Sequence, residues 1–386
     1  MTSNDHSHQC LTRRAWLVLT GSALTACGGG GGGGPLAGFP GTGGTGSPVF
    51  AQGSISGFGS VIVNGIRFDD LRARVMVDGQ LATSADLRLG MVAEVQGERG
   101  ADLTLGTASQ IEAWTIAQGG IVRPDANGFV VAGMTIQTTG NTVFDGVSAA
   151  SQLVSGQTVA VWGLQTGTDG TRWSATRVAV MPGDVPMVSS GLVGVSGTQR
   201  LMNGQALTGD LVKDLSVGAL VRVQGTLAAD GKGIAVASVK SLGVAALIQG
   251  QGEVEIEGYV TSIASVSRFT IGGIDVDASG ASYKPSGAVI TLGARVEIHA
   301  TWASRVLKAT TVELEDEQKL EEAELSGTIT TFTSVSNFVL RSQRCDASSA
   351  TFKDGKAADL KAGVKVIVKG TKAGDRLNVT TLEFDD

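Results

Sequence analysis

The chain has 386 residues, with 30 Lys and Arg against 36 Asp and Glu, which gives a net charge of −6 at pH 7. This mildly acidic balance argues against a nucleic-acid-binding protein and against binding to anionic lipid through a basic patch. The 56 glycines and the low aromatic content of 5% favour tight β-structure over helical bundles.

Residues 1–26 have the features of a lipoprotein signal peptide. Arg13 and Arg14 precede an apolar run, 15–26, that is too short to span a bilayer as a helix. The run ends in Leu24-Thr25-Ala26-Cys27, which resembles a bacterial lipobox. That resemblance implies that Cys27 is lipidated and that the membrane is a partner through this anchor. Gly28 after the cysteine implies sorting to the outer membrane, and both the twin-arginine and the general export routes stay open.

Residues 27–52 are predicted to be a flexible tether. An unbroken glycine run, 28–34, is followed by a stretch rich in Gly, Thr, Pro and Ser. Such a composition does not build a core and behaves as a linker.

A short phrase recurs five times in the rest of the chain. It consists of an opening Gly, two residues, then a small aliphatic, a middle residue, a β-branched residue, one more residue and a closing Gly. The five occurrences span 90–97, 156–163, 218–225, 293–300 (which closes on Ala300) and 363–370. Side chains of a strand alternate between its faces, so the two aliphatic positions are expected to face a core. The middle residue is Glu94, Arg222 or Glu297 in three copies, and this opposite face is predicted to be wet.

A Gly that opens a strand recurs at Gly53, Gly120, Gly191, Gly258 and Gly327, a period of about 70 residues. Five or six short strands in such a length are typical of a small OB-like barrel. The chain is therefore predicted to be all-β, with a tandem array of about five barrels after a Gly-rich amino terminus. The predicted domains are 53–115, 116–182, 187–243 (shortened), 254–316 and 325–386, with an acidic linker at 317–324.

Each copy contains a predicted hairpin turn after its first strand. The turn is Asn-Gly or another small pair in four copies, whereas Arg341-Ser342 in the fifth predicts another turn type. The third copy lacks about nine residues, roughly one strand, so its barrel is predicted to be incomplete or supported by a neighbour.

Lipobox, glycine tether and tandem copies of this motif together resemble an uncharacterised family of bacterial envelope lipoproteins built from tandem small β-domains. The family is known as a domain of unknown function. The resemblance implies a fold and a location, and no chemistry.

Candidate chemical groups are few. His299 stands where the other copies have Gln96, Trp162, Gln224 and Lys369, so a solvated strand residue is expected rather than a general base. Cys345 is expected to be a buried small residue rather than a reactive thiol. No catalytic, cofactor-binding or metal-binding residue is predicted, and Cys27 is the single predicted modification site.

Two further features have alternative interpretations. The helix-like acidic run 313–324 either binds calcium or is a solvated surface, and the second is preferred. The tryptophans either stack on sugars or bases or pack in the core, and packing is preferred because they do not recur in every copy. They are Trp114, Trp162, Trp173 and Trp302.

These observations predict a non-catalytic lipoprotein of the bacterial cell envelope whose β-domains act as binding or spacer modules. The expected partner is a protein or a glycan, with no nucleic acid and no cofactor. The alternative is an envelope hydrolase that cleaves glycans with carboxylates alone, because paired acids in a cleft leave no spacing signal.

Overall fold

The computed structural model describes residues 46–228 and 233–385, which are built almost entirely of β-strands. Their helical segments are four single 3-10 turns, η1 (Ala150–Gln152), η2 (Asp210–Val212), η3 (Val244–Ala246) and η4 (Ala357–Asp359). None of the helices in these residues has the length and hydrophobicity needed to cross a bilayer. The predicted signal peptide and the lipidation site Cys27 lie outside the described residues.

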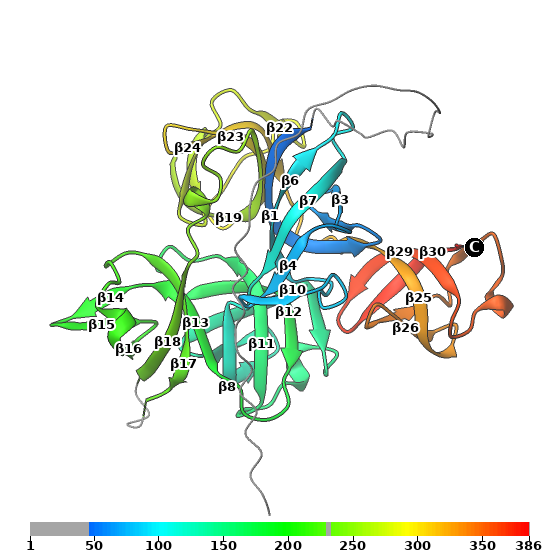
Figure 1. The fold of residues 1–386 in the computed structure, drawn as a ribbon, viewed down its shortest axis with the longest axis horizontal. Helices are drawn as coiled ribbons and strands as arrows, with labels where there is room; N and C mark the ends of the chain where they lie inside the picture. Colours follow the sequence, from blue (N-terminus) through cyan, green and yellow to red (C-terminus); the bar gives the residue numbers. More distant parts are fainter. Residues whose placement is uncertain (1–45, 229–232, 386) are drawn as a thin grey trace, which may run out of the picture. The chain divides into compact units, whose positions relative to one another are not determined.

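The strands form five successive barrels (Figure 1). The first barrel contains β1 (Ser47–Phe58), β2 (Val61–Val63), β3 (Ile66–Asp69), β4 (Arg74–Val77), β5 (Gln80–Ala82), β6 (Val92–Arg99) and β7 (Leu105–Ala113). The second contains β8 (Ala117–Asp125), β9 (Gly128–Val131), β10 (Met134–Asp145), β11 (Thr158–Gln165) and β12 (Arg172–Val180). The third contains β13 (Met187–Leu192), β14 (Gly194–Ser196), β15 (Gln199–Met202), β16 (Gln205–Thr208), β17 (Leu220–Leu227) and β18 (Gly233–Ser241).

The last two barrels have six strands each. The fourth contains β19 (Glu253–Ser265), β20 (Arg268–Ile271), β21 (Ile274–Asp277), β22 (Ser282–Lys284), β23 (Arg295–Ala303) and β24 (Val306–Leu314). The fifth contains β25 (Glu322–Ser334), β26 (Asn337–Leu340), β27 (Gln343–Asp346), β28 (Thr351–Lys353), β29 (Lys365–Ala373) and β30 (Arg376–Phe384).

All five barrels close in the same strand order. In the first barrel β1 pairs with β2 and β6, β2 with β3, and β6 with β7, all antiparallel, and β3 runs parallel to β7 to complete the ring. The second, fourth and fifth barrels repeat this pattern, and so does the third with its first strand divided into β13 and β14. A closed ring of five short strands is the architecture of a small OB-like barrel. The predicted fold class is confirmed.

The repeated phrase is the fourth strand of each ring. Its opening glycines all have positive φ, from 80° to 90°, a conformation that costs Gly little. Its closing residue lies at a β-bulge in every barrel, and a Cβ on Gly163 would come within 2.2 Å of the Ser174 carbonyl oxygen. The two aliphatic positions are buried in all five barrels, as predicted.

Of two predictions about individual copies, the one for the fifth copy is wrong, and the one for the third copy holds only in its second alternative, contact with a neighbour. The turn at Arg341-Ser342 has positive φ at both residues (49° and 60°), as the other hairpin turns have, and Arg341 Nε holds it by donating to the Ser326 carbonyl oxygen at 2.9 Å. The third barrel is not incomplete, because its missing residues correspond only to the short extra strand that pairs with the last strand in other barrels. It does contact a neighbour, since β13 pairs with β8 at Val188 and Gln118.

The first barrel begins earlier than predicted. Residues 47–52, assigned to the tether, form the start of β1, which pairs in parallel with β19 of the fourth barrel and, further along, with β25 of the fifth. Val49 and Ala51 are buried in the core of the first barrel, whereas Phe50 is buried in the core of the fourth. This two-sided burial overrides the polar composition of the surrounding stretch.

The acidic run 313–324 is not helical. Residues 313–314 end β24 and residues 322–324 begin β25, so the linker is 315–321 and the fifth barrel starts at Glu322 rather than 325. Pairing of these ends with β23 and β29 outweighs the helix propensity of the run.

Candidate functional site

Two of the three charged middle residues of the repeated phrase contact other barrels instead of water. The third, Glu297, contacts His299 of its own barrel. Glu94 and Arg222, predicted to be wet, are 8% and 2% exposed. Glu94 Oε2 lies 2.9 Å from Lys240 Nζ, which joins the first barrel to the third. Arg222 Nη2 lies 2.8 Å from Asp78 Oδ1, again between the third barrel and the first. The prediction of a wet face is wrong for Glu94 and Arg222, because each charge has a partner from a distant part of the chain.

Both of these cations lie over the Trp114 ring system. Lys240 Nζ is 4.1 Å from the centre of one ring of Trp114, and the guanidinium carbon of Arg222 is 5.3 Å from it. Cations over an indole face are attracted by its negative π-surface. Burial raises the pKa of the Glu94 carboxyl, and Lys240 opposes this effect. The contact between the first and third barrels is therefore a desolvated cluster of charges and one aromatic ring.

A second charged cluster joins the first, fourth and fifth barrels. The Ser54 backbone N–H donates to Glu257 Oε2 at 2.8 Å, and Arg295 Nε donates to Glu257 Oε1 at 2.7 Å. Arg295 also pairs with Glu321, which in turn pairs with the buried Lys372 of β29. Burial alone would raise the pKa of Glu321, but Lys372 and Arg295 together lower it.

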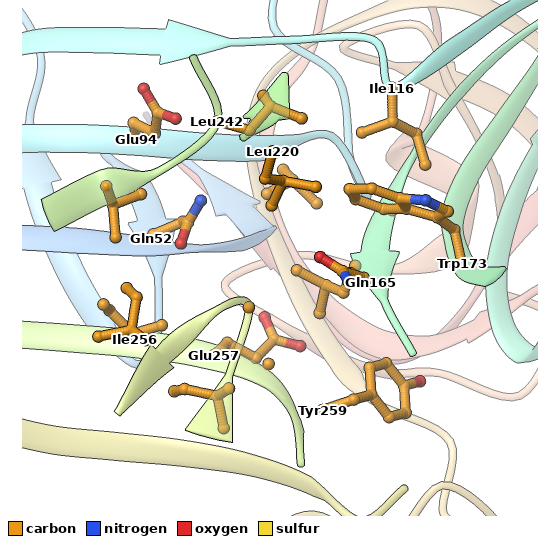
Figure 2. Close-up of a pocket in the computed structure, with 18 of the residues that line it drawn as sticks. Gln52, Glu94, Ile116, Gln165, Trp173, Leu220, Leu242, Ile256, Glu257 and Tyr259 are labelled. Atoms are coloured by element: carbon orange, nitrogen blue, oxygen red, sulfur yellow. The ribbon is translucent and has the colours of Figure 1, made fainter. Parts of the chain in front are cut away.

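A cavity of about 80 Å³ lies where four barrels meet. Ile116, Leu220 and Ile256 contribute to its wall (Figure 2). Trp114 also lines it. The second barrel adds Gln165 and Trp173, and the fourth adds Tyr259. Because no single barrel supplies these walls, the cavity exists only through the association of the barrels.

Beside its apolar side chains, the lining of this space includes Gln52, Glu94, Gln165 and Glu257. Gln165 is 9% exposed, and its Nε2 donates to the Gly167 carbonyl oxygen at 2.7 Å, while its Oε1 has no hydrogen-bond partner among the described residues. Apolar cavities with a small number of directed polar groups are typical ligand sites. The free carbonyl oxygen of Gln165 marks the place for a hydrogen-bond donor.

A separate acidic cleft of about 290 Å³ lies beside Ser54, Arg295 and the linker 315–321. Burial raises the pKa of Glu315 to about 7, an effect that Arg295 reduces and nearby carboxylates increase. Burial also raises the pKa of Glu297. The cleft therefore combines a carboxyl group that is partly protonated at neutral pH with ion-paired carboxylates, an arrangement suited to proton transfer.

The acids of the run 313–324 do not converge on one calcium site within the described residues. Glu317 accepts a hydrogen bond from the Tyr259 hydroxyl, Glu321 pairs with Arg295 and Lys372, and Glu324 lies 2.7 Å from Arg67 and 3.0 Å from Lys369. Each carboxylate therefore has a donor from a different segment.

His299 is not the solvated strand residue that was expected. Its Nδ1 lies 2.5 Å from Glu255 Oε2 and its Nε2 lies 3.4 Å from Glu297 Oε1. The two carboxylates raise the pKa of His299 to about 9, although partial burial opposes them. Glu255 and Glu257 were missed from the sequence, and alternation of Glu with Val and Ile at 253–257 is the pattern that marks them as one strand face.

The tryptophans and Cys345 have the packing roles that were predicted, with one addition. Trp162 and Trp173 are buried, and Trp114 and Trp173 both line the cavity between the barrels. Cys345 is 1% exposed in β27, and burial raises the pKa of its thiol to about 12. This environment is that of an unreactive core cysteine.

Comparison with known proteins finds a family match for three of the five barrels. Residues 118–179, 257–313 and 326–380 match a family described as a domain of unknown function (DUF5666). These stretches cover most of the second, fourth and fifth barrels, so the predicted resemblance to a domain of unknown function is confirmed for three of the five repeats. No curated protein matches the chain. A similar solved structure, "drosophila Unr CSD456", has 11% identity and a TM-score of 0.14, covering 45% of this chain and 79% of its own.

Proposed function

We propose that this chain, three of whose barrels match a domain of unknown function, is a non-catalytic binding protein of the bacterial cell envelope. The observation that carries the binding role is the cavity lined by four barrels. Anchoring through a lipid on Cys27 at the outer membrane is supported by the order of charge, apolar run and cysteine at the amino terminus.

The walls of the cavity indicate the kind of group it takes. Trp114, Trp173 and Tyr259 offer aromatic surface, and Gln165 Oε1 offers one unpartnered acceptor. A volume of about 80 Å³ is smaller than an engineered apolar cavity of about 150 Å³ that holds benzene. The cavity therefore suits a small apolar group with one donor, either a free molecule or the end of a longer ligand.

Pyrrole is a suitable probe for this role, because it joins an apolar ring smaller than benzene to one N–H donor. We expect pyrrole to raise the melting temperature of the full chain and to change its tryptophan fluorescence. Leu220→Trp should abolish both effects, because the larger side chain would occupy the cavity. Leu211→Trp is the matched control, since Leu211 is 44% exposed and lies away from the cavity lining. Equal responses of the two variants would contradict the proposal.

The envelope location has its own test. Mass spectrometry of the protein from its native host should find an acylated Cys27, and Cys27→Ala should release the chain from the membrane fraction. An unmodified thiol at this position in exported protein would contradict lipid anchoring.

A second candidate function, a hydrolase acting on glycans through carboxylates, is favoured by the acidic cleft. Glu315 there has a pKa raised to about 7 by burial, as a general acid requires. Incubation of the full chain with peptidoglycan and polysaccharides tests this function. Turnover that Glu315→Gln abolishes would favour the hydrolase over the binding protein, and binding without turnover would exclude it.

A further inference from the structure

We propose that Glu255, Glu297 and His299 form a binding site for one divalent transition-metal cation, of which Zn²⁺ is the best match. This site is distinct from the cavity between the barrels, and its residues lie on neighbouring strands, β19 and β23. One ligand atom from each residue lies within 4.8 Å of the other two.

Strand register places these residues together. Glu255 on β19 lies directly opposite His299 on β23, and Glu297 precedes His299 by two residues on the same strand face. Cross-strand neighbours on one face have Cβ atoms about 5 Å apart, within reach of a shared ion. His299 occupies the space between the two carboxylates, and a modest rotation of its imidazole would direct one ring nitrogen to a cation that both carboxylates share.

A second observation points to a ligand at this position. Glu255 is 1% exposed, and its Oε2 has no hydrogen-bond partner of acceptable geometry among the described residues, although it is directed at His299. This oxygen is therefore paired with His299 without a directed hydrogen bond, and coordination to a bound cation would supply the directed contact that it lacks.

Arg99 holds the other oxygen of the same carboxylate. Its Nη1 lies 2.5 Å from Glu255 Oε1 and 3.0 Å from Glu253 Oε2. Hydrogen bonds from a residue that does not itself bind the metal orient a metal-binding carboxylate in this way and leave its second oxygen free to coordinate.

Charge balance also favours a divalent ion. With His299 neutral, the three carboxylates of Glu253, Glu255 and Glu297 face the single guanidinium of Arg99. The resulting excess of two negative charges equals the charge of one divalent cation. An imidazole nitrogen with two carboxylate oxygens suits Zn²⁺ better than Ca²⁺ or Mg²⁺, which prefer oxygen ligands alone.

The cluster is open to ions from solution. The side chains of His299 and Glu297 are 26% and 18% exposed, whereas Glu255 lies behind them. A metal site needs such an entry path, and three protein ligands leave a fourth position for water.

Isothermal titration of the chelator-treated full chain with ZnCl₂, without a polyhistidine tag, tests the site. We expect one Zn²⁺ per chain at this cluster and no comparable heat with CaCl₂. Replacement of Zn²⁺ by Co²⁺ should produce visible absorption bands that report the ligand set. His299→Ala and Glu297→Gln should each weaken Zn²⁺ binding by at least about tenfold, and circular dichroism should show that both stay folded.

Matched controls distinguish this site from other side chains of the protein that could bind Zn²⁺. The pair His6→Ala and His8→Ala removes the remaining histidines of the full sequence and should leave binding at the cluster unchanged. Glu313→Gln removes an acid of the neighbouring run and should also have no effect. Zn²⁺ binding that survives His299→Ala, or no binding by the folded wild-type chain, would show that the cluster is an imidazole–carboxylate ion pair and would overturn the proposal.

Discussion

The Ser54 backbone N–H donates to the Glu257 carboxylate at 2.8 Å, across 203 positions of the chain. The donor belongs to the first strand of the first barrel and the acceptor to the first strand of the fourth. Glu257 also binds Arg295, which pairs with Glu321 of the linker, and Glu321 in turn pairs with Lys372 of the fifth barrel. One buried carboxylate thus links three barrels, and the array is an interlocked assembly rather than a string of independent units.

Loss of this carboxylate should weaken the whole assembly. We expect Glu257→Ala to lower the free energy of unfolding by about 3 kcal/mol, because it leaves the Ser54 N–H unpaired and removes one of the two partners of Arg295. Glu253→Ala is the control, since Glu253 is 36% exposed and should cost less than about 1 kcal/mol. Urea unfolding of both variants provides the measurement. Equal losses would show that Glu257 does not link the barrels.

Phe50 should stabilise a barrel to which its own strand does not belong. It is fully buried in the core of the fourth barrel, so Phe50→Ala should lower the free energy of unfolding by about 3 to 5 kcal/mol. Hydrogen exchange should increase mainly in β19 to β24. Pro48→Ala, an exposed change on the same strand, should leave the exchange pattern unaltered, whereas increased exchange confined to β2 to β7 would contradict this assignment.

Substitutions at the bulge that closes the repeated phrase should change the free energy of unfolding by different amounts in different barrels. Gly163→Ala places a Cβ within 2.2 Å of the Ser174 carbonyl oxygen, so the facing strand must move, at a cost of about 1 to 3 kcal/mol. Ala300 already occupies the same position in the fourth barrel, and Ala300→Gly should cost about 1 kcal/mol or less. Urea midpoints of the two variants check this difference. Similar costs would show that the bulge does not require glycine.

Stability should depend on the protonation of Glu315. Its pKa in the folded chain, about 7, lies above the ordinary value of 4.5 because of burial, so the folded state holds this proton more tightly than the unfolded state. The resulting stabilisation is complete below pH 4.5 and is lost as the pH rises through 7. Relative to Glu315→Gln, the melting temperature of the wild-type chain should therefore fall between pH 5 and pH 8.

A control for that pH dependence is Glu98→Gln, because Glu98 is exposed. This variant should follow the wild-type curve over the same pH range. If the wild-type chain and Glu315→Gln have parallel curves, Glu315 does not titrate near neutrality.

Several parts of the fold were predictable from contiguous residues. The alternation around Val159 and Val161, the positive-φ glycine before them and the Asn64-Gly65 turn are local properties, and together they predict short strands closed into a small barrel. The Arg341-Ser342 turn shows the limit of this reasoning. Its type depends on a contact between Arg341 and Ser326, which the turn sequence does not contain.

The candidate sites required the tertiary structure. Glu94, Arg222 and His299 occupy strand positions whose alternation indicates solvent, and only the approach of Lys240, Asp78 and Glu255 explains their burial or pairing.

The sequence by itself determined how many barrels there are and where most of their turns and bulges lie, because turns, bulges and two-residue periodicity depend on neighbouring residues. Only the tertiary structure decided which charges lie between barrels and where the cavity forms. The free energy of burying a charge depends on a partner that lies tens to hundreds of residues away, and strand periodicity carries no information about that partner.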